Sequence, residues 1–309
     1  MRQITQRTFG GPEVLEVEET DPPVPLPGEV LVSVRAIGLN PVEGAVRAGY
    51  FPVLGQPPFV LGWDVSGVVT EAVPGVNRFE VGDEVYGMPM FPRAAGTYAE
   101  TVAAPSKQLA RKPRSVDHAH AAALPLVGLT AYQMLVEVAD VKPGQRVLVH
   151  AAGGGLGHVA VQIAKDLGAH VIGTASAGKI DFVRGLGADE VIDYKAVDFT
   201  GAVRDVDVVL DLVGNGYGDR SVEVLRDDGL LITAVERGDA ELAARVRAAG
   251  RRFAGITVEP DGRALEHLAE LVDAGRLKIH VEHAIPFEEV VRAHALLGSG
   301  LTGKAVLTV

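Results

Sequence analysis

The sequence predicts an α/β protein with two domains, a doubly wound parallel sheet with helices on both faces and a smaller β barrel. Three observations lead to this prediction. From about residue 120 onward, apolar strands alternate with helical segments, which is typical of a parallel sheet. The first third of the chain instead has strands separated by proline and glycine, as in 21–28. A length of 309 residues also exceeds the usual size of one domain.

The clearest strand of the N-terminal part is 28–35, where valines at every second position alternate onto one face. The segments 65–71 and 81–86 are predicted as further strands of the same small barrel. This part of the chain therefore has the pattern of an irregular β domain rather than of a parallel sheet.

The later part of the chain predicts a six-stranded, doubly wound sheet. Its strands are expected at 146–151, 170–174, 190–192, 206–211, 229–234 and 253–258. Helices are expected between them, including 179–186 and 219–226, each of which ends close to a glycine.

The C-terminal tail adds a strand at 278–286, a helix at 288–297 and a strand at 304–309. These elements exceed what a six-stranded sheet needs, so we expect the tail to return to the N-terminal domain. The predicted domains are residues 1–121 together with 276–309, and residues 122–275.

A glycine-rich turn follows the first strand of this sheet, in Val147-Leu-Val-His-Ala-Ala-Gly-Gly-Gly-Leu-Gly157, and leads into a helical segment at 158–168. Glycine lets the backbone approach a pyrophosphate closely, and the free N–H groups of the following helix favour negative charge. Ala152 replaces the first glycine of the Gly-x-Gly-x-x-Gly pattern. Because a dinucleotide binds after the first strand of such a sheet, we predict these cofactor residues: Gly154, Gly155, Leu156 and Gly157.

Composition and charge disfavour several classes of function. A net charge of -11 without a basic stripe disfavours nucleic-acid binding. No apolar run approaches the ~20 residues that a membrane-spanning helix needs. The absence of cysteine excludes disulfides, thiol nucleophiles and the common structural zinc sites. The first residues lack the apolar region of a signal peptide, so we expect a cytoplasmic protein.

The residues after the second predicted strand favour NADPH over NADH. In NAD-selective domains an acidic residue at this place binds the ribose 2′-hydroxyl, and its charge would repel a 2′-phosphate. Here Thr174 and Ser176 can donate hydrogen bonds, and Lys179 supplies a positive charge. The alternative is that Lys179 only contacts solvent at the start of a helix.

Several motifs occur in order along the chain. They are Gly38-Leu-Asn-Pro41, Leu61-Gly-Trp-Asp-Val-Ser-Gly-Val-Val69, Val81-Gly-Asp-Glu-Val85, Gly128-Leu-Thr-Ala-Tyr132, the turn 151–157, Leu186-Gly-Ala-Asp-Glu-Val-Ile-Asp-Tyr194 and Gly303-Lys304. In these motifs the chain resembles, over essentially its full length, the zinc-free quinone oxidoreductase (zeta-crystallin-like) family of the medium-chain dehydrogenase/reductase superfamily. The resemblance implies a GroES-like substrate domain, a Rossmann domain, a homodimer, and NADPH-dependent reduction of quinones or activated alkenes.

The resemblance also implies further cofactor residues. Tyr194 should lie beside the adenosine phosphate. Thr130 matches a position near the nicotinamide, although it could instead cap the adjoining helix. Val213 and Gly214 follow the fourth strand, where they either line the cofactor cleft or only pack at the strand end.

Asn40 and Tyr50 are predicted to position the substrate. Asn40 could donate to a substrate carbonyl, or it could satisfy the backbone of its own loop. Tyr50 lies in a loop in which the family often has a tyrosine, although Phe51 aligns more closely with that position.

Zinc catalysis is not expected. Zinc-dependent relatives need a cysteine and a Gly-His-Glu segment, and the latter reads Gly62-Trp63-Asp64 here. The histidine pairs at 118/120 and 280/283 fit surface or capping positions better than metal ligands, and no nucleophile elbow is present. We therefore predict no metal site and no hydrolase chemistry.

The sequence thus predicts a zinc-independent reductase that transfers hydride from NADPH to a quinone. A conjugated acceptor stabilises the anion that hydride addition produces, so its oxygen does not require a metal. An enone or 2-alkenal double-bond reductase would use the same residues. A non-catalytic NADPH-binding sensor or structural protein would keep the cofactor residues without turnover.

Overall fold

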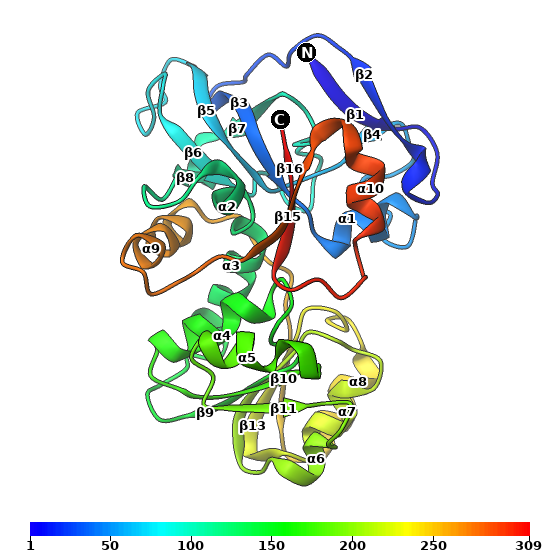
Figure 1. Ribbon diagram of the computed structural model, residues 1–309, viewed down its shortest axis with the longest axis vertical. Coiled ribbons are helices and arrows are strands. Elements are labelled where there is room, and N and C mark those ends of the chain that lie inside the picture. The colour runs from blue at the N-terminus through cyan, green and yellow to red at the C-terminus, as the bar shows by residue number, and fades with distance from the viewer. The chain divides into compact units, whose positions relative to one another are not determined.

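The computed structural model describes residues 1–309, which form two compact units (Figure 1). The first unit comprises Met1–Leu129, Glu259–Gly275 and Ile279–Val309, and the second comprises Thr130–Val258 and Arg276–Lys278. The first is built mainly on antiparallel strands and the second on a parallel sheet, which confirms the predicted α/β class.

The second unit contains a six-stranded parallel sheet in the order β11-β10-β9-β12-β13-β14. Its strands are β9 (Arg146–Val149), β10 (His170–Ala175), β11 (Glu190–Asp193), β12 (Val206–Asp211), β13 (Leu225–Thr233) and β14 (Arg252–Gly255). All six predicted strands are present, with differences at their ends. The strand order reverses between β9 and β12, so right-handed crossovers place the successive helices on both faces of the sheet.

The helices of this unit are η3 (Gln133–Val138), α4 (Gly157–Asp166), η4 (Ala177–Lys179), α5 (Ile180–Gly185), α6 (Phe199–Ala202), α7 (Tyr217–Val222) and α8 (Ala240–Ala248). Helix α4 packs beside β9 and β10, and α7 and α8 pack beside β13 and β14. Apolar side chains from the strands, among them Leu148, Ile172 and Leu231, form the core with residues of the helices. The helix predicted at 219–226 ends earlier because Leu225 is buried and pairs with Val206 in the sheet.

The first unit contains a seven-stranded sheet, in which β15-β16-β3-β5-β6-β8 are neighbours and β7 pairs with β3, and a three-stranded sheet β2-β1-β4. The strands are β1 (Arg2–Gln6), β2 (Leu15–Glu19), β3 (Glu29–Gly38), β4 (Phe59–Val60), β5 (Val65–Ala72), β6 (Glu84–Gly87), β7 (Thr101–Pro105), β8 (Leu109–Arg111), β15 (Val281–Pro286) and β16 (Lys304–Thr308). The alternating valines of β3 are buried. Strand β16 pairs with β3, so the C-terminal tail completes the sheet that the N-terminal segment begins.

The helices of the first unit are η1 (Pro12–Val14), α1 (Pro41–Arg47), η2 (Ser106–Gln108), α2 (His118–Ala122), α9 (Gly262–Asp273), η5 (Phe287–Glu289) and α10 (Val290–Ala295). The chain passes from the first unit to the second within α3 (Pro125–Tyr132). None of the helices combines the length and the apolar composition that crossing a membrane requires.

The domain boundaries differ from those predicted. We expected residues 122–275 to form one domain, but the structure places α9 in the first unit. The reason is tertiary: the Leu265 carbonyl of α9 accepts a hydrogen bond from the Tyr86 hydroxyl at 2.6 Å, and Glu266 pairs with Arg78 at 2.7 Å. These contacts involve residues far apart in the sequence, which local patterns do not reveal.

Candidate functional site

The strand order of the second unit reverses between β9 and β12, which makes the carboxyl ends of these strands a topological switch point. Dinucleotides bind at this position in doubly wound sheets. The glycine turn, residues 151–157, follows β9, and Val213 and Gly214 follow β12. Predicted cofactor residues from two separate segments therefore lie at one edge of the sheet.

The conformation of the glycine turn requires glycine at its end. The carbonyl oxygen of Ala151 accepts a hydrogen bond from the Gly154 N–H at 2.9 Å. A Cβ atom at Gly157 would lie 2.2 Å from that oxygen, and one at Gly154 would lie 3.2 Å from it. Gly157 also begins α4, whose N-terminal end carries the positive end of the helix dipole and favours an anion. The turn thus has the features of a pyrophosphate site.

The structure explains why Ala152 can replace the first glycine of the pattern. The left-handed backbone conformation falls on Ala151, with a φ of 51°, and not on Ala152. A Cβ atom on Gly173 of β10 would lie 2.9 Å from the Ala152 Cβ, so the methyl group uses space that Gly173 leaves open. The alanine therefore does not disrupt the turn.

Three predicted residues lie near the carboxyl ends of β10 and β11. Ser176 follows β10 directly and is half-buried, and the Tyr194 N–H donates to the Ala175 carbonyl at 3.2 Å. The aliphatic part of Lys179 lies against the glycine turn, since a Cβ on Gly153 would be 2.9 Å from the Lys179 Cδ. The structure thus places Lys179 beside the turn and Ser176 and Tyr194 at the ends of neighbouring strands, and their contact with a 2′-phosphate stays a prediction.

Thr174 has a different position from the one we expected. Its residue surface is only 1% exposed, and its hydroxyl oxygen lies 3.2 Å from the Nδ1 atom of His150. A hydroxyl that faces the protein interior cannot donate to a phosphate at the sheet edge. The prediction that Thr174 binds the 2′-phosphate directly is therefore wrong.

Val213 and Gly214 form a turn held by Asp211, the last residue of β12. Both N–H groups donate to the same Asp211 carboxylate oxygen, at 2.9 and 3.0 Å, and Gly214 has a φ of 68°. Such an arrangement fixes the backbone at the strand end. Contact of these two residues with the cofactor stays a prediction.

Thr130 is the sixth residue of α3 and is buried. An N-cap residue precedes the first turn of its helix, so the alternative that Thr130 caps this helix is wrong. Its proximity to the nicotinamide stays a prediction.

In the first unit, Asn40 is the centre of a buried polar network. It is the N-cap of α1 and forms a capping box with Glu43. Its Nδ2 atom donates to Asp64 Oδ2 at 2.9 Å, and its Oδ1 atom accepts from the Nζ atom of Lys304. Lys304 also donates to the Leu39 carbonyl at 2.7 Å. The other oxygen of Asp64 accepts from the Leu126 N–H at 2.8 Å, so the network connects α1, β16 and the start of α3.

Burial governs the ionisation of this network. Burial, together with the Asp64 charge, raises the pKa of Glu43 to about 8, against the opposing effect of Lys304 and of hydrogen bonds from Asn40. Burial also raises the pKa of Asp64 to about 6, again opposed by Lys304 and Asn40. One ammonium group thus faces two carboxyl groups, and the arrangement is neutral when Glu43 keeps its proton.

The network bears on both the predicted substrate contact and the question of zinc. Asn40 would have to break one of its internal hydrogen bonds to donate to a substrate carbonyl, and this role stays a prediction. The ammonium of Lys304 lies 3.9 Å from Asp64, the last residue of the segment that stands in place of Gly-His-Glu in this sequence. A bound cation beside it would be repelled, so these residues do not fit zinc. No group of three or more His, Asp or Glu side chains is arranged to hold a metal ion.

Tyr50 lies in the turn after α1 and is 87% exposed. Its backbone N–H donates to the Ala45 carbonyl at 2.9 Å, so the turn is anchored although the side chain projects outward. The contact of Tyr50 with the substrate stays a prediction.

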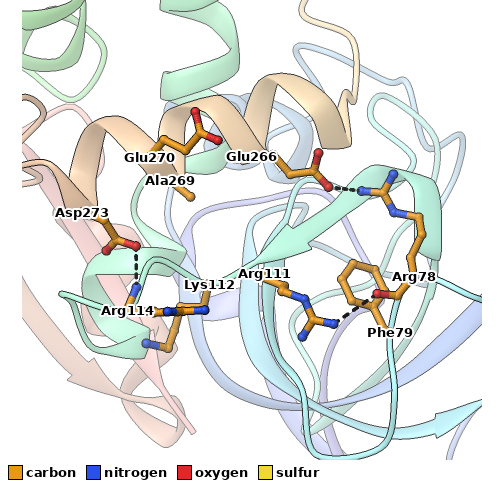
Figure 2. Close-up of a pocket in the computed structure, with 9 residues that line it drawn as sticks. All are labelled: Arg78, Phe79, Arg111, Lys112, Arg114, Glu266, Ala269, Glu270 and Asp273. Atoms are coloured by element: carbon orange, nitrogen blue, oxygen red, sulfur yellow. Dashed lines mark hydrogen bonds and ion pairs between the residues drawn. The ribbon is translucent and has the colours of Figure 1, made fainter.

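An open pocket of about 520 Å³ in the first unit contains none of the predicted residues. Figure 2 shows that it lies between α9 and the segments around Phe79 and Arg111. Arg78 of this pocket binds Glu266 at 2.7 Å, and Asp273 accepts from the backbone N–H of Arg114 at 3.2 Å. Because the pocket contains none of the residues of the glycine turn or the polar network, we do not assign the functional site to it.

No role was predicted for Glu43, Lys304 or His150. Two of them are polar residues next to apolar runs, since Lys304 begins the strand Lys-Ala-Val-Leu-Thr and His150 directly follows Arg-Val-Leu-Val. A charged or imidazole group at the end of a buried strand can be recognised in the sequence. The residues that form hydrogen bonds with it cannot.

Comparison with known proteins places this geometry in a family. Residues 26–114 match the model of the alcohol dehydrogenase GroES-like domain, and residues 186–307 match a model described as zinc-binding dehydrogenase. A quinone oxidoreductase from Pongo abelii is 33% identical over 99% of this chain and 97% of its own length. A 2-haloacrylate reductase from Burkholderia sp is 35% identical over 96% of each protein.

Solved structures agree with these relatives. The quinone oxidoreductase from Coxiella burnetii has a TM-score of 0.95 and 35% identity, covering 100% of this chain and 99% of its own. The Escherichia coli quinone oxidoreductase complexed with NADPH has a TM-score of 0.91 and 29% identity, covering 100% of both chains. The similarity therefore extends over both units.

Proposed function

The chain belongs to the zeta-crystallin-like quinone oxidoreductase family of the medium-chain dehydrogenase/reductase superfamily, and we propose that it reduces a quinone with NADPH, without zinc. The observation that carries this proposal is the glycine turn at the switch point of the sheet, with the aliphatic part of Lys179 beside it. This arrangement offers a pyrophosphate site and a nearby positive charge to one dinucleotide.

The choice of NADPH over NADH is supported by the residues that follow β10. An aspartate or glutamate there would repel a 2′-phosphate, but the chain reads Ala175-Ser176-Ala-Gly-Lys179. Ser176 can donate a hydrogen bond and Lys179 can pair with the phosphate charge. Tyr194, whose backbone is bonded to Ala175, can pack beside the adenosine.

When bound, NADPH supplies a hydride to the acceptor. The protein contributes binding and orientation: the turn Gly154–Gly157 leaves room for the pyrophosphate, and the positive end of the α4 helix dipole favours its charge. In a reaction without zinc, the acceptor stabilises the developing anion by its own conjugation. Quinones and enones do this, whereas simple ketones normally require a Lewis acid.

A second candidate function is reduction of an activated carbon–carbon double bond. The similarity to a 2-haloacrylate reductase favours this alternative, because such a substrate is also a conjugated acceptor. A non-catalytic NADPH-binding protein is the third possibility that the sequence left open.

Steady-state assays separate these candidates. NADPH oxidation would be followed with a quinone and, separately, with an enone, each at a series of concentrations. We expect turnover with the quinone and a higher kcat/KM than with the enone. The reverse preference would support the double-bond reductase, and tight NADPH binding without turnover on either would refute both enzymatic functions.

The phosphate role of Lys179 has its own test. We expect Lys179→Ala to raise the KM for NADPH by about tenfold, as loss of a charge-assisted contact implies, and to leave the KM for NADH nearly unchanged. Arg184→Ala is the matched control, since it removes an exposed positive charge from the neighbouring helix α5. Equal losses with both cofactors would contradict the phosphate contact.

We further propose, from the family resemblance, that the protein acts as a homodimer in the cytoplasm. Sedimentation velocity tests the assembly, because a monomer at micromolar concentration would contradict it.

A further inference from the structure

His150 lies between β9 and the glycine turn and is fully buried, yet the proposed function does not use it. Both ring nitrogens have hydroxyl partners: Nδ1 lies 3.2 Å from Thr174 Oγ1, and Nε2 lies 3.0 Å from Ser221 Oγ. Its backbone N–H donates to the Leu210 carbonyl of β12 at 3.1 Å. The residue thus connects β9, β10, β12 and α7 immediately before the turn.

The partners of the ring assign the direction of each hydrogen bond. Ser221 gives its hydroxyl hydrogen to the Tyr217 carbonyl at 2.7 Å, so Ser221 has to accept from the Nε2–H of His150. Burial, with a contribution from Arg220, lowers the pKa of His150 to about 3, so the ring is neutral and its Nδ1 atom is an acceptor. Thr174 therefore donates its hydroxyl hydrogen to Nδ1.

The remaining lone pairs of the Thr174 hydroxyl face the glycine turn. The Ala151 N–H donates to Thr174 Oγ1 at 3.3 Å, and the Ala152 N–H donates to the Thr174 carbonyl at 2.9 Å. Ala151 has a φ of 51°, a conformation that is uncommon for a residue with a Cβ atom. Both hydrogen bonds hold this residue in that conformation, and its carbonyl in turn bonds to Gly154.

Aromatic side chains enclose the hydrogen bonds of His150, Thr174 and Ser221. The rings of Phe199 and Tyr217 lie edge-on to the His150 ring, with centroid distances of 4.7 and 5.0 Å. The Arg220 guanidinium covers Phe199 at 4.7 Å and bonds to Asp198 at 2.8 Å. Water is excluded from this series of side-chain hydrogen bonds, so it does not easily replace one that is lost.

We propose that His150, Thr174 and Ser221 are positioning residues, which hold Ala151 and thereby keep the glycine turn in the conformation that binds the cofactor pyrophosphate. This inference rests on the proposed use of the turn for NADPH. Thr174 then acts on the cofactor only through Ala151, and the adenosine phosphate is bound by other residues.

This proposal makes a prediction that separates it from direct phosphate contact. NADPH and NADH share the pyrophosphate and differ in the 2′-phosphate. A residue that positions the turn affects both cofactors equally, whereas a residue that contacts the 2′-phosphate affects NADPH alone.

The experiment uses Thr174→Val, which keeps the shape of the side chain and removes its hydroxyl. Dissociation constants for NADPH and NADH are measured by titrating cofactor fluorescence, without substrate. We expect both to rise by about tenfold, the equivalent of one hydrogen bond, while kcat at saturating NADPH changes by less than about twofold. Thr174→Ser, which keeps the hydroxyl, restores binding of both cofactors.

Thr233→Val is the matched control, because Thr233 is also buried at the carboxyl end of a strand and bonds to the backbone N–H groups of Val235 and Glu236. We expect it to lower the melting temperature while leaving both dissociation constants near those of the wild type. His150→Phe keeps a ring in the aromatic cluster and removes both hydrogen bonds. It should weaken binding of both cofactors, and combining it with Thr174→Val should add little, because the two act as one unit.

Each outcome has one meaning. If the wild-type protein binds neither cofactor, the proposed function fails and this inference fails with it. If the wild type binds and Thr174→Val weakens only NADPH, or neither cofactor, the inference is overturned while the proposed function stands. Should Thr174→Val not fold, His150→Phe gives the same comparison of the two cofactors.

Discussion

Glu43 offers a direct test of the buried network, because Glu43→Gln replaces a protonated carboxyl by a neutral amide of the same shape. The amide oxygen can still accept from the Asn40 N–H, as a Glu43 oxygen does in the structure. The other Glu43 oxygen, which accepts from Asn40 Nδ2 at 3.3 Å, becomes an amide nitrogen. The substitution therefore keeps the capping box, loses this long hydrogen bond and removes the ability to ionise.

The expected effect follows from the difference in pKa between the folded and unfolded states. Glu43 loses its proton near pH 4.5 when unfolded, but burial holds it until about pH 8 when folded. Between these values the folded state binds the extra proton, so stability falls as pH rises. From pH 5 to pH 8 the free energy of unfolding of the wild type falls by about 3 to 4 kcal/mol through this group. The Glu43→Gln protein does not share this loss.

Urea unfolding at a series of pH values measures this difference. Trp63 is the single tryptophan of the chain, is fully buried and adjoins Asp64, so its fluorescence reports unfolding of the first unit. At a urea slope of about 2 kcal/mol per molar, the midpoints of wild type and variant should diverge by roughly 1.5 to 2 M between pH 5 and pH 8. Asp64 is present in both proteins, so its own titration largely cancels in the comparison.

Glu71→Gln is the control, since Glu71 is exposed on β5 in the same unit. Its midpoints should follow those of the wild type at every pH. Parallel curves for wild type and Glu43→Gln would refute the reasoning, because they would mean that Glu43 does not retain a proton in the folded protein.

Two further substitutions test the Lys304–Asp64 pair and the glycine turn. Lys304→Met removes the buried ammonium from Asp64 and should destabilise the first unit by about 3 to 5 kcal/mol, measured by the same urea midpoint; adding Asp64→Asn should recover part of this loss. Full stability of Lys304→Met alone would show that the pair contributes nothing. Gly157→Ala places a Cβ atom 2.2 Å from the Ala151 oxygen, so the turn has to shift, and NADPH binding should weaken by more than about tenfold. Gly201→Ala, which meets no atom within 4 Å, should bind NADPH normally, and equal binding by both variants would contradict the role of the turn.

The six strands of the parallel sheet and the amphipathic helix after the glycine turn could be predicted from the sequence, because their apolar periodicity is local. Ser176 and Lys179 were proposed from the residues after the second strand and Tyr194 from the family resemblance, and the structure places them after strands whose carboxyl ends share one edge. The sequence could not show that the Thr174 hydroxyl is used inside the protein, because its partner His150 comes from another segment, 24 residues away. Helix α9 was assigned to the wrong unit because its contacts are with β8 and neighbouring residues.

What the sequence by itself determined is the order of strands and helices, the family, and the glycine turn with an alanine at its first position. Only the tertiary structure decided which residues support that turn. The left-handed conformation falls on Ala151, Gly173 leaves room for the Ala152 methyl, and the imidazole of His150 orients the hydroxyl that holds Ala151. The physical reason is that backbone pattern and residue size act between neighbours in the chain, whereas hydrogen-bond direction and the ionisation of buried groups depend on partners that folding brings together.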